Sequence, residues 1–353
     1  MYQSLRPLIF RLDPERAHNL TVQMLRLAGN LPPVRGLLRR IFTPESQKPV
    51  QSFGLTFPNP VGLAAGYDKD GLAWPGLACL GFGHIEVGTV TPRPQAGNPR
   101  PRIFRIPSEQ AVINRMGFPG RGADFVARRL SKYRGRREEE HRPSSQSTTP
   151  QYTNAPILGL NIGKNKVTPN EEAAQDYLYL TEKFAPLVDY LAVNVSSPNT
   201  VGLRRLQARD MLTDLLSQLD AARHRSHTPR PILVKLAPDL SDAELDDALD
   251  AIIRTGMDGV IATNTTISRE RLHSPVGGET GGLSGAPLRQ RSTEMIAKIH
   301  RRTAGNLPII GVGGITSPRD AKEKLAAGAT LVQVYTGLIY RGPGLVREIV
   351  EGL

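Results

Sequence analysis

Cysteine is almost absent from this chain, since Cys79 is the only one among 353 residues. A single thiol excludes an internal disulfide and a zinc site built on cysteines, and it fits a reducing compartment. Of the seven histidines only His84 lies near a predicted strand, and no two have metal-ligand spacing. No G-x-S-x-G elbow or catalytic carboxylate pair occurs either. We therefore expect no metal centre, and Cys79 is expected to pack in the core.

Long apolar runs are also missing. No stretch of about 18 apolar residues exists, which excludes a membrane-spanning helix. We expect no signal peptide at the N-terminus, because Arg6, Arg11 and Asp13 interrupt any apolar segment. A hydrophobic content of 39% and a charged content of 22% are ordinary for a globular protein. The length allows one large domain, or a large domain with a small appendage.

Acidic residues are outnumbered, and the net charge is +12. Such a charge suits nucleic acid, anionic lipid or an anionic substrate, and it also occurs in arginine-rich proteomes. The total charge does not choose among these. The position of the charge is more informative.

Residues 1–45 are predicted to form a small basic helical region. Its first apolar stripe has helical spacing and consists of Leu5, Leu8, Ile9 and Leu12. Asp13-Pro14 is typical of an N-cap, and the second helix should stop near Gly29. Within residues 1–40, seven arginines stand against only two acidic residues. This pattern fits helices lying on anionic lipid, and equally helices that pack their apolar face on the main domain.

Residues 46–353 are predicted to form a (β/α)₈ barrel, that is, an α/β TIM barrel. Eight short apolar runs alternate there with helical periodicity, as expected for eight βα units. A doubly wound sheet is the alternative, but no G-x-G-x-x-G follows the first run, and eight strands close a barrel. The runs are Val61–Ala65, Ile85–Val90, Ile157–Ile162, Tyr190–Val195, Ile232–Leu236, Gly259–Ala262, Ile309–Val312 and Leu331–Tyr335.

Two segments do not fit a minimal barrel. Residues 91–118 contain five prolines and two β-like pieces, Ile103–Ile106 and Ala111–Ile113, which predict a small antiparallel excursion over the barrel mouth. Residues 134–155 combine charged residues with Ser, Thr, Gln and Pro. That composition predicts a disordered insertion.

Polar residues gather where the predicted strands end, which is where barrel enzymes place their active sites. The turns at 311–315 and 335–337, after the last two strands, contain glycines and predict a phosphate site. Lys69 and Lys235 lie at the ends of buried runs, and a buried lysine needs an anion, an electron-rich ligand or a salt-bridge partner.

Asparagine also recurs at these ends, notably in the stretch 191–202. Each amide offers a donor and an acceptor on one plane, although any single asparagine is more often a turn former. Within this stretch Ser197 is the candidate base, and its weak basicity requires a route for the proton through water or a neighbour. The asparagines in question are Asn114, Asn161, Asn194, Asn199 and Asn264.

Ten motifs resemble those of dihydroorotate dehydrogenases over about residues 50–350, in strand order. The helix LDPERAH is similar to that of the class 2, membrane-associated, quinone-reducing members. The serine at position 197 also favours class 2, because class 1 relatives use a cysteine there. The motifs are NPVGLAAGYDKDG, IEVGTVTPRPQ.GNP.PR, INRMGF, LGLNIGKNK, NVSSPNT.GLR, VKLAPDL, GVIATNTT, TGGLSG, PIIGVGGI and LVQVYTGL.

The resemblance implies an FMN cofactor and a dihydroorotate pocket. FMN would be held by Ala65, Gly66, Tyr67, Asp68, Lys69, Thr89, Asn161, Asn194, Lys235, Thr263, Gly285, Gly314, Tyr335 and Thr336. The pocket would be lined by Lys69, Asn114, Arg115, Met116, Gly117, Phe118, Asn194, Asn199, Asn264 and Thr265. Ser197 would be the catalytic base that takes the C5 proton of dihydroorotate, while a hydride leaves C6 for the flavin.

The resemblance further implies electron transfer to a membrane quinone in pyrimidine biosynthesis. The protein would be a peripheral monomer on the cytoplasmic face of the cell membrane, bound to anionic lipid by its N-terminal helices, with no nucleic-acid partner. Two alternatives stay open: another FMN barrel such as a tRNA dihydrouridine synthase, and a non-catalytic barrel that binds a phosphate ligand.

Overall fold

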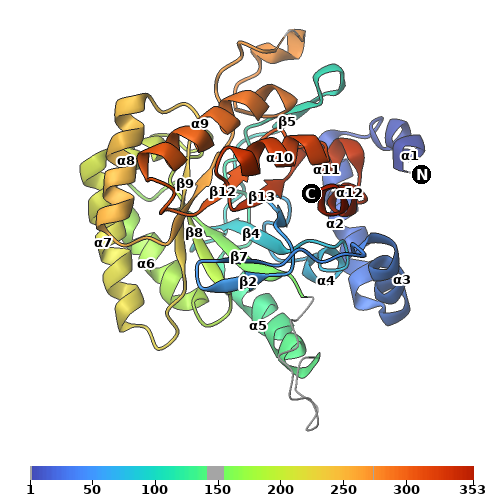
Figure 1. Cartoon of the computed structure of the whole chain (residues 1–353), viewed down its shortest axis with the longest axis horizontal. Helices are drawn as coiled ribbons and strands as arrows, with labels where there is room; N and C mark the ends of the chain where they lie inside the picture. The colour runs from blue at the N-terminus through green and yellow to red at the C-terminus, as the bar shows by residue number, and fades with distance from the viewer. Residues whose placement is uncertain (1, 141–154, 273) are drawn as a thin grey trace.

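Eight parallel strands close into a barrel, which confirms the predicted (β/α)₈ fold (Figure 1). The computed structural model describes residues 2–140, 155–272 and 274–353. Four strands have the predicted bounds, and the other four differ by one or two residues at an end. Around the barrel the strands are β3 Val61–Leu63, β4 His84–Val90, β7 Ile157–Ile162, β8 Tyr190–Asn194, β9 Ile232–Leu236, β10 Gly259–Ala262, β12 Ile309–Val312 and β13 Leu331–Val334.

Helices surround the barrel and bury the outer face of its strands. Because both faces of the strands are covered, their sequences are nearly continuous apolar runs. In this outer layer α8 has a capping box, in which the hydroxyl of Ser241 and the carboxylate of Glu244 bond each other's backbone N–H groups. The helices are α4 Trp74–Leu77, α5 Ala123–Glu140, α6 Ala173–Phe184, α7 Arg209–Arg225, α8 Asp242–Arg254, α9 Arg289–Arg302, α10 Pro318–Ala326, α11 Thr336–Arg341 and α12 Leu345–Gly352.

The prediction of disorder from residue 134 onward was wrong for its first seven residues, because α5 continues to Glu140. This helix is anchored by Ala123, Val126 and Leu130, which are fully buried against the barrel. Arginine and glutamate are good helix formers, so the anchored helix extends into the charged segment. Residues 141–154 of the predicted insertion lie outside the described residues.

The predicted antiparallel excursion is confirmed, and it contains one strand more than expected. β5 Ile103–Ile106 pairs with β6 Ala111–Asn114, which also pairs with β11 Gly282–Gly285. The sequence around β11 is rich in glycine and was not recognised as a strand. At the opposite end of the barrel a second unpredicted element, the hairpin of β1 Val50–Ser52 and β2 Leu55–Phe57, covers the strand starts.

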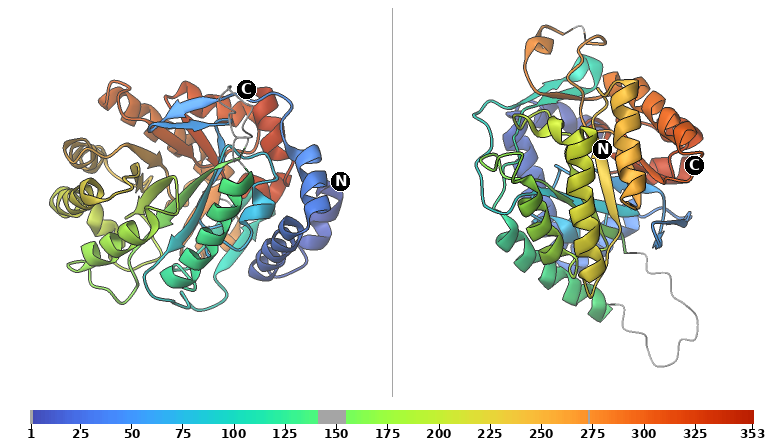
Figure 2. Two further views of the ribbon diagram at one scale, coloured as in Figure 1. Left: turned by 90° about the horizontal axis from the view of Figure 1, so that it is seen from below. Right: turned by 90° about the vertical axis from the view of Figure 1, so that its left-hand side faces the viewer.

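Three N-terminal helices lie along one side of the barrel (Figure 2). They are α1 Tyr2–Ile9, α2 Pro14–Asn30 and α3 Pro32–Phe42. Asp13 caps α2 as predicted by accepting hydrogen bonds from the N–H groups of Glu15 and Arg16 at 3.1 and 3.0 Å. No helix within the described part of the chain is both long and apolar enough to cross a bilayer.

These helices have two different apolar faces. Ala17 and Val22 are buried toward the barrel, and the carboxylate of Glu15 is paired with Arg102 at 2.8 Å. Nine other large apolar side chains remain exposed, namely Leu5, Leu8, Leu12, Leu20, Met24, Leu27, Leu31, Leu37 and Ile41. Packing against the main domain therefore accounts for only part of the apolar surface.

Candidate active site

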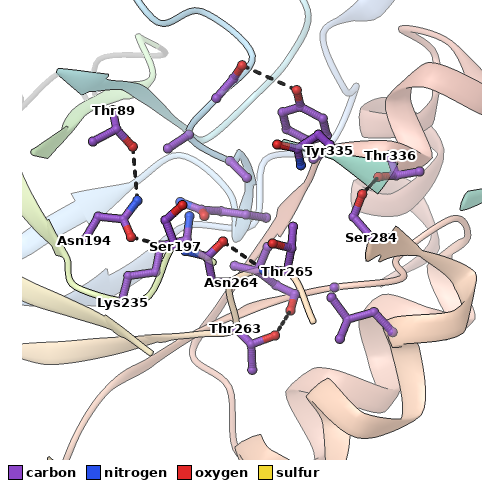
Figure 3. A pocket seen from close by; sticks show the side chains of 18 of the residues that line it. Thr89, Asn194, Ser197, Lys235, Thr263, Asn264, Thr265, Ser284, Tyr335 and Thr336 are labelled. Atoms are coloured by element: carbon purple, nitrogen blue, oxygen red, sulfur yellow. Dashed lines mark hydrogen bonds between the residues drawn. The ribbon is translucent and has the colours of Figure 1, made fainter. Parts of the chain in front are cut away.

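A cavity opens at the carboxyl ends of the barrel strands, where the polar residues were predicted to meet (Figure 3). Seven of the eight barrel strands contribute residues from their ends or from the loops that follow, the exception being β7, and β6 and β11 of the small sheet cover one side. The lining residues are Ala64, Ala65, Gly66, Lys69, Thr89, Asn114, Met116, Gly117, Phe118, Asn194, Ser197, Asn199, Lys235, Thr263, Asn264, Thr265, Ser284, Gly285, Leu288, Val312, Gly313, Gly314, Ile315, Gln333, Tyr335, Thr336 and Gly337.

Two glycine-containing turns after β12 and β13 lie against each other in this cavity. A Cβ on Gly337 would lie 2.1 Å from the carbonyl oxygen of Ile315, so the close contact of the turns requires glycine. Gly314 adopts a φ of 72°, a left-handed conformation that favours glycine. The turns leave backbone N–H groups near the cavity at the position where barrels of this type bind phosphate.

Three of the predicted asparagines form one hydrogen-bonded group. The amide nitrogen of Asn194 donates to Asn161 Oδ1 at 3.0 Å and to Thr89 Oγ1 at 3.1 Å. Its oxygen accepts from Asn264 Nδ2 at 3.2 Å. A separate pair joins Asn199 Nδ2 to Asn114 Oδ1 at 3.2 Å. These contacts hold planar amides in place at the cavity wall, which suits recognition of a flat polar ligand.

A buried carboxylate, Glu86, lies beneath this wall in the barrel interior, where it is 0% exposed. It accepts hydrogen bonds from Asn161 Nδ2 at 2.9 Å, Gln333 Nε2 at 3.0 Å and Tyr190 OH at 3.2 Å. Lys235 Nζ lies 3.5 Å from Glu86 Oε1. Lys235 thus lines the cavity, where a ligand can reach it, and also forms a salt bridge, so it has both of the partners expected for a buried lysine. Burial raises the pKa of Tyr190 well above its ordinary value.

Lys69 differs from Lys235 in its surroundings. Its ammonium donates to the carbonyl oxygen of Gly66 at 2.7 Å, and no carboxylate of the described residues forms an ion pair with it. Burial lowers the pKa of Lys69 to about 8. At neutral pH this lysine therefore places a cation in the cavity that an anionic ligand can neutralise.

Ser197 lies in the loop after β8 and is 4% exposed. Its Oγ accepts a hydrogen bond from the backbone N–H of Asn199 at 3.2 Å. Figure 3 shows Asn194, Ser197 and Asn264 close together at one wall of the cavity. No imidazole or carboxylate of the described residues hydrogen-bonds this hydroxyl, so a proton that it accepts must leave through water.

Four predicted residues lie outside the cavity lining. Tyr67 packs its ring edgewise on Tyr335, with centroids 6.1 Å apart, and Asn161 supports the amide group from behind. Asp68 accepts hydrogen bonds from the N–H groups of Leu72 and Ala73, each at 2.7 Å, and burial raises its pKa. Arg115 is paired with the carboxylate of Glu279 at 2.5 Å. The ligand contacts predicted for these four remain predictions.

Four further lining residues, Val312, Gly313, Ile315 and Gly337, lie in the turns predicted as a phosphate site. The sequence analysis does not single out Ala64, Ser284, Leu288 and Gln333, and the apolar side chains of Ala64 and Leu288 give no chemical signal. Gln333 did carry a signal, because it is a lone polar residue within the last apolar run. Glu86, in the second run, carried the same signal.

The fold and the cavity define a class: a (β/α)₈-barrel enzyme with glycine turns after its last two strands and an amide-lined pocket. A family described as dihydroorotate dehydrogenase matches residues 49–353. The chain belongs to the dihydroorotate dehydrogenase family, whose members are flavoenzymes.

Close relatives cover the chain from end to end. The chain is 52% identical to the dihydroorotate dehydrogenase (quinone) of Acidithiobacillus ferrooxidans, with 100% of this chain and 94% of the relative aligned. The protein of the same name from Stenotrophomonas maltophilia K279a is 49% identical, with 100% and 96% aligned. The crystal structure of DHODH from Eimeria tenella in complex with ferulenol superposes with a TM-score of 0.85 at 40% identity, covering 96% of this chain and 90% of that one.

Proposed function

We propose that this chain oxidises (S)-dihydroorotate to orotate in de novo pyrimidine biosynthesis, with FMN as its cofactor and a membrane quinone as final electron acceptor. The observation that carries the proposal is the full-length identity of about half to proteins named dihydroorotate dehydrogenase (quinone). The cavity supports it, because a lysine, a serine and several asparagines meet beside a phosphate-binding end.

The residues present fit FMN. The turns after β12 and β13 offer backbone N–H groups to a phosphate, and the amide group with Thr89 and Lys235 offers polar contacts to the edge of a flavin ring. Gly314 and Thr336 belong to these turns, and Gly285 of β11 lines the same cavity. When bound, FMN would supply hydride acceptance and two-electron storage.

The chain's own residues would bind the substrate and move its proton. Lys69 is charged at neutral pH and would bind the carboxylate of dihydroorotate. Asn199, Asn264 and Thr265 would recognise the amide edges of the ring. Ser197 Oγ would take the proton at C5 and release it to water, while the hydride leaves C6.

We further propose that the N-terminal helices bind an anionic membrane surface and give access to the quinone. The nine exposed apolar side chains with neighbouring arginines describe an interfacial surface. The ring of His18 on α2 lies 5.2 Å from Tyr67, which contacts Tyr335 of the cavity lining. Aromatic rings thus connect these helices to the cavity. We propose a peripheral monomer at the cytoplasmic face.

The purified holoenzyme tests the proposal in two measurements. A visible spectrum should show flavin absorbance, and its absence would favour the non-catalytic barrel. Dihydroorotate with a short-chain quinone should then be turned over far faster than dihydroorotate with fumarate or NAD. Failure of the quinone to accept electrons would refute the proposed acceptor. A tRNA dihydrouridine synthase would need a cysteine acid, and Cys79 is not among the residues of the cavity lining.

A further inference from the structure

Arg204 joins two active-site loops without lining the cavity itself. It lies in the short 3₁₀ helix Leu203–Gln207, just after the loop that contains Ser197. Its Nε donates to the carbonyl oxygen of Ser196 at 3.1 Å, and its Nη2 donates to that of Thr265 at 3.0 Å. One guanidinium therefore spans the gap between the loop after β8 and the loop after β10.

Asp239, in the loop after β9, holds this guanidinium from the third side. Its Oδ2 lies 2.8 Å from Arg204 Nη1 and also accepts the backbone N–H of Ile267 at 3.1 Å. Its Oδ1 accepts from Arg291 Nη1 at 3.1 Å and from the hydroxyl of Thr266. The carboxylate thereby ties the ends of β9 and β10 to α9.

The arrangement requires these two residue types. The Arg204 side chain is 22% exposed and that of Asp239 is 13% exposed, so both charges are largely withdrawn from water and depend on each other. Guanidinium is planar, always charged and able to donate in several fixed directions, whereas a lysine ammonium is a compact point charge on a flexible chain. Arg204 ends the segment GLR at 202–204, and Asp239 lies in the segment APDL at 237–240. The proposed mechanism assigns no role to either segment.

We propose that Arg204 and Asp239 are positioning residues that set the distance between the base Ser197 and the substrate-recognising residues Asn264 and Thr265. This inference rests on the proposed function. Without the guanidinium, the carbonyl groups of Ser196 and Thr265 lose their shared donor, and the bond from Asn264 Nδ2 to Ser196 Oγ at 2.9 Å holds the two loops together less firmly than both contacts do. A displacement of about 1 Å at a reacting group can cost on the order of 100-fold in rate.

The test separates the two half-reactions of the holoenzyme by stopped flow, normalised to bound flavin. In Arg204→Gln we expect flavin reduction at saturating dihydroorotate to slow by about 10- to 100-fold. Flavin reoxidation by a short-chain quinone should stay within about twofold of the parent. Asp239→Asn should show the same split, and the double variant should be no worse than the slower single variant, because the two residues act as a unit.

Two further variants distinguish positioning from general destabilisation. Arg204→Lys keeps the charge but not the three-way geometry, so it should recover only part of the lost reduction rate. Arg209→Gln is the matched control, because Arg209 pairs with Asp250 on the outer helices, and both of its half-reactions should match the parent. If Arg204→Gln does not fold, the reduction rates of Arg204→Lys and Asp239→Asn decide.

Specific outcomes would overturn the inference. Equal slowing of both half-reactions, full recovery by Arg204→Lys, or parent-like reduction in Asp239→Asn would each reduce the pair to a stabilising ion pair. A parent enzyme whose flavin is not reduced by dihydroorotate would instead overturn the proposed function, which is a distinct result.

Discussion

The two ends of the barrel are built from the same eight strands but differ in chemistry. At the start of the strands, the β1–β2 hairpin places the fully buried Phe57 against His84, with ring centroids 5.4 Å apart. Phe53 approaches Gly259 so closely that a Cβ there would lie 2.6 Å from its ring. At the other end, the strands finish in amides, hydroxyls, lysines and glycine turns around a cavity.

The difference shows how one framework separates stability from chemistry. The apolar end is packed so closely that its histidine, His84, is 0% exposed, and the ring nitrogens of His84 have no hydrogen-bond partner among the described residues. The polar end keeps its side chains connected in networks that an incoming ligand can share. We therefore expect substitutions at the closed end to lower stability and substitutions at the open end to lower activity.

The largest effect is expected at the open end, for Ser197→Ala. Removing the proposed base should slow flavin reduction by about 10²- to 10⁴-fold. Reoxidation by quinone should not change, and the lost hydrogen bond from Asn199 should cost only about 1 kcal/mol of stability. Stopped-flow kinetics and chemical denaturation measure these quantities, with Ser131→Ala on α5 as the control. Equal slowing of both half-reactions would remove Ser197 from the base role.

At the closed end, Phe57→Ala should destabilise the fold by about 3–5 kcal/mol, because it leaves a cavity where no solvent can enter. The turnover of the remaining folded enzyme, per bound flavin, should stay near that of the parent. Urea denaturation measures the loss, and Ile253→Ala on α8 is the control, since that side chain is 53% exposed. A large fall in turnover per flavin would break the separation of the two ends.

Lys69→Met should weaken dihydroorotate binding by about 1.5–3 kcal/mol, the usual contribution of a hydrogen bond to a charged group. Because burial lowers the pKa of Lys69 to about 8, the ammonium loses its proton as pH rises through that value. Parent affinity should therefore fall above pH 8, and the variant should lack this dependence. Orotate carries the same carboxylate as dihydroorotate and is not oxidised. Titration of the oxidised enzyme with orotate therefore measures the loss of affinity and its pH dependence, with the exposed Lys322→Met as control. A variant that keeps the pH dependence would contradict the assignment.

The smallest effect concerns His84. Burial lowers its pKa from 6.5 to about 3, so the unfolded chain binds a proton between these values that the folded chain does not. His84 therefore leaves the free energy of unfolding unchanged above pH 6.5. Below pH 6.5 it lowers the free energy of unfolding by at most about 1.4 kcal/mol for each pH unit.

Denaturation of the parent and of His84→Met between pH 6.5 and 5 measures this slope. The variant should lose stability less steeply, while His224→Gln, at an exposed site on α7, should behave like the parent. His18, whose pKa burial also lowers to about 3, accounts for part of the remaining slope. Identical slopes in parent and His84→Met would show that the closed end admits water.

Local patterns were sufficient for the barrel and for much of the cavity. The apolar runs and helical stripes predict all eight strands, with bounds that agree with the structure to within two residues. The prediction succeeds because strands buried on both faces have continuous apolar sequences. Polar residues at the ends of those runs, such as Asn194 and Lys235, meet as expected because parallel strands all end on one side.

Other features could not be recognised from neighbouring residues. β11 pairs with β6 across about 170 positions, and its glycines resemble a loop until the partner strand is in place. The charged composition at the end of α5 predicts disorder, because composition does not show that the helix is already anchored. Arg115 was expected in the pocket, yet it pairs with Glu279 more than 160 residues away.

The sequence by itself thus determined the fold class, the strand order and which end of the barrel has polar chemistry, since these follow from periodicity and from where apolar runs stop. Only the tertiary structure decided how that chemistry is held. The contacts of Glu86 with Lys235, and of Arg204 with Asp239 and two loops, join residues that are far apart in the chain. Their geometry depends on closing the barrel, because closure brings the strand ends within hydrogen-bonding distance.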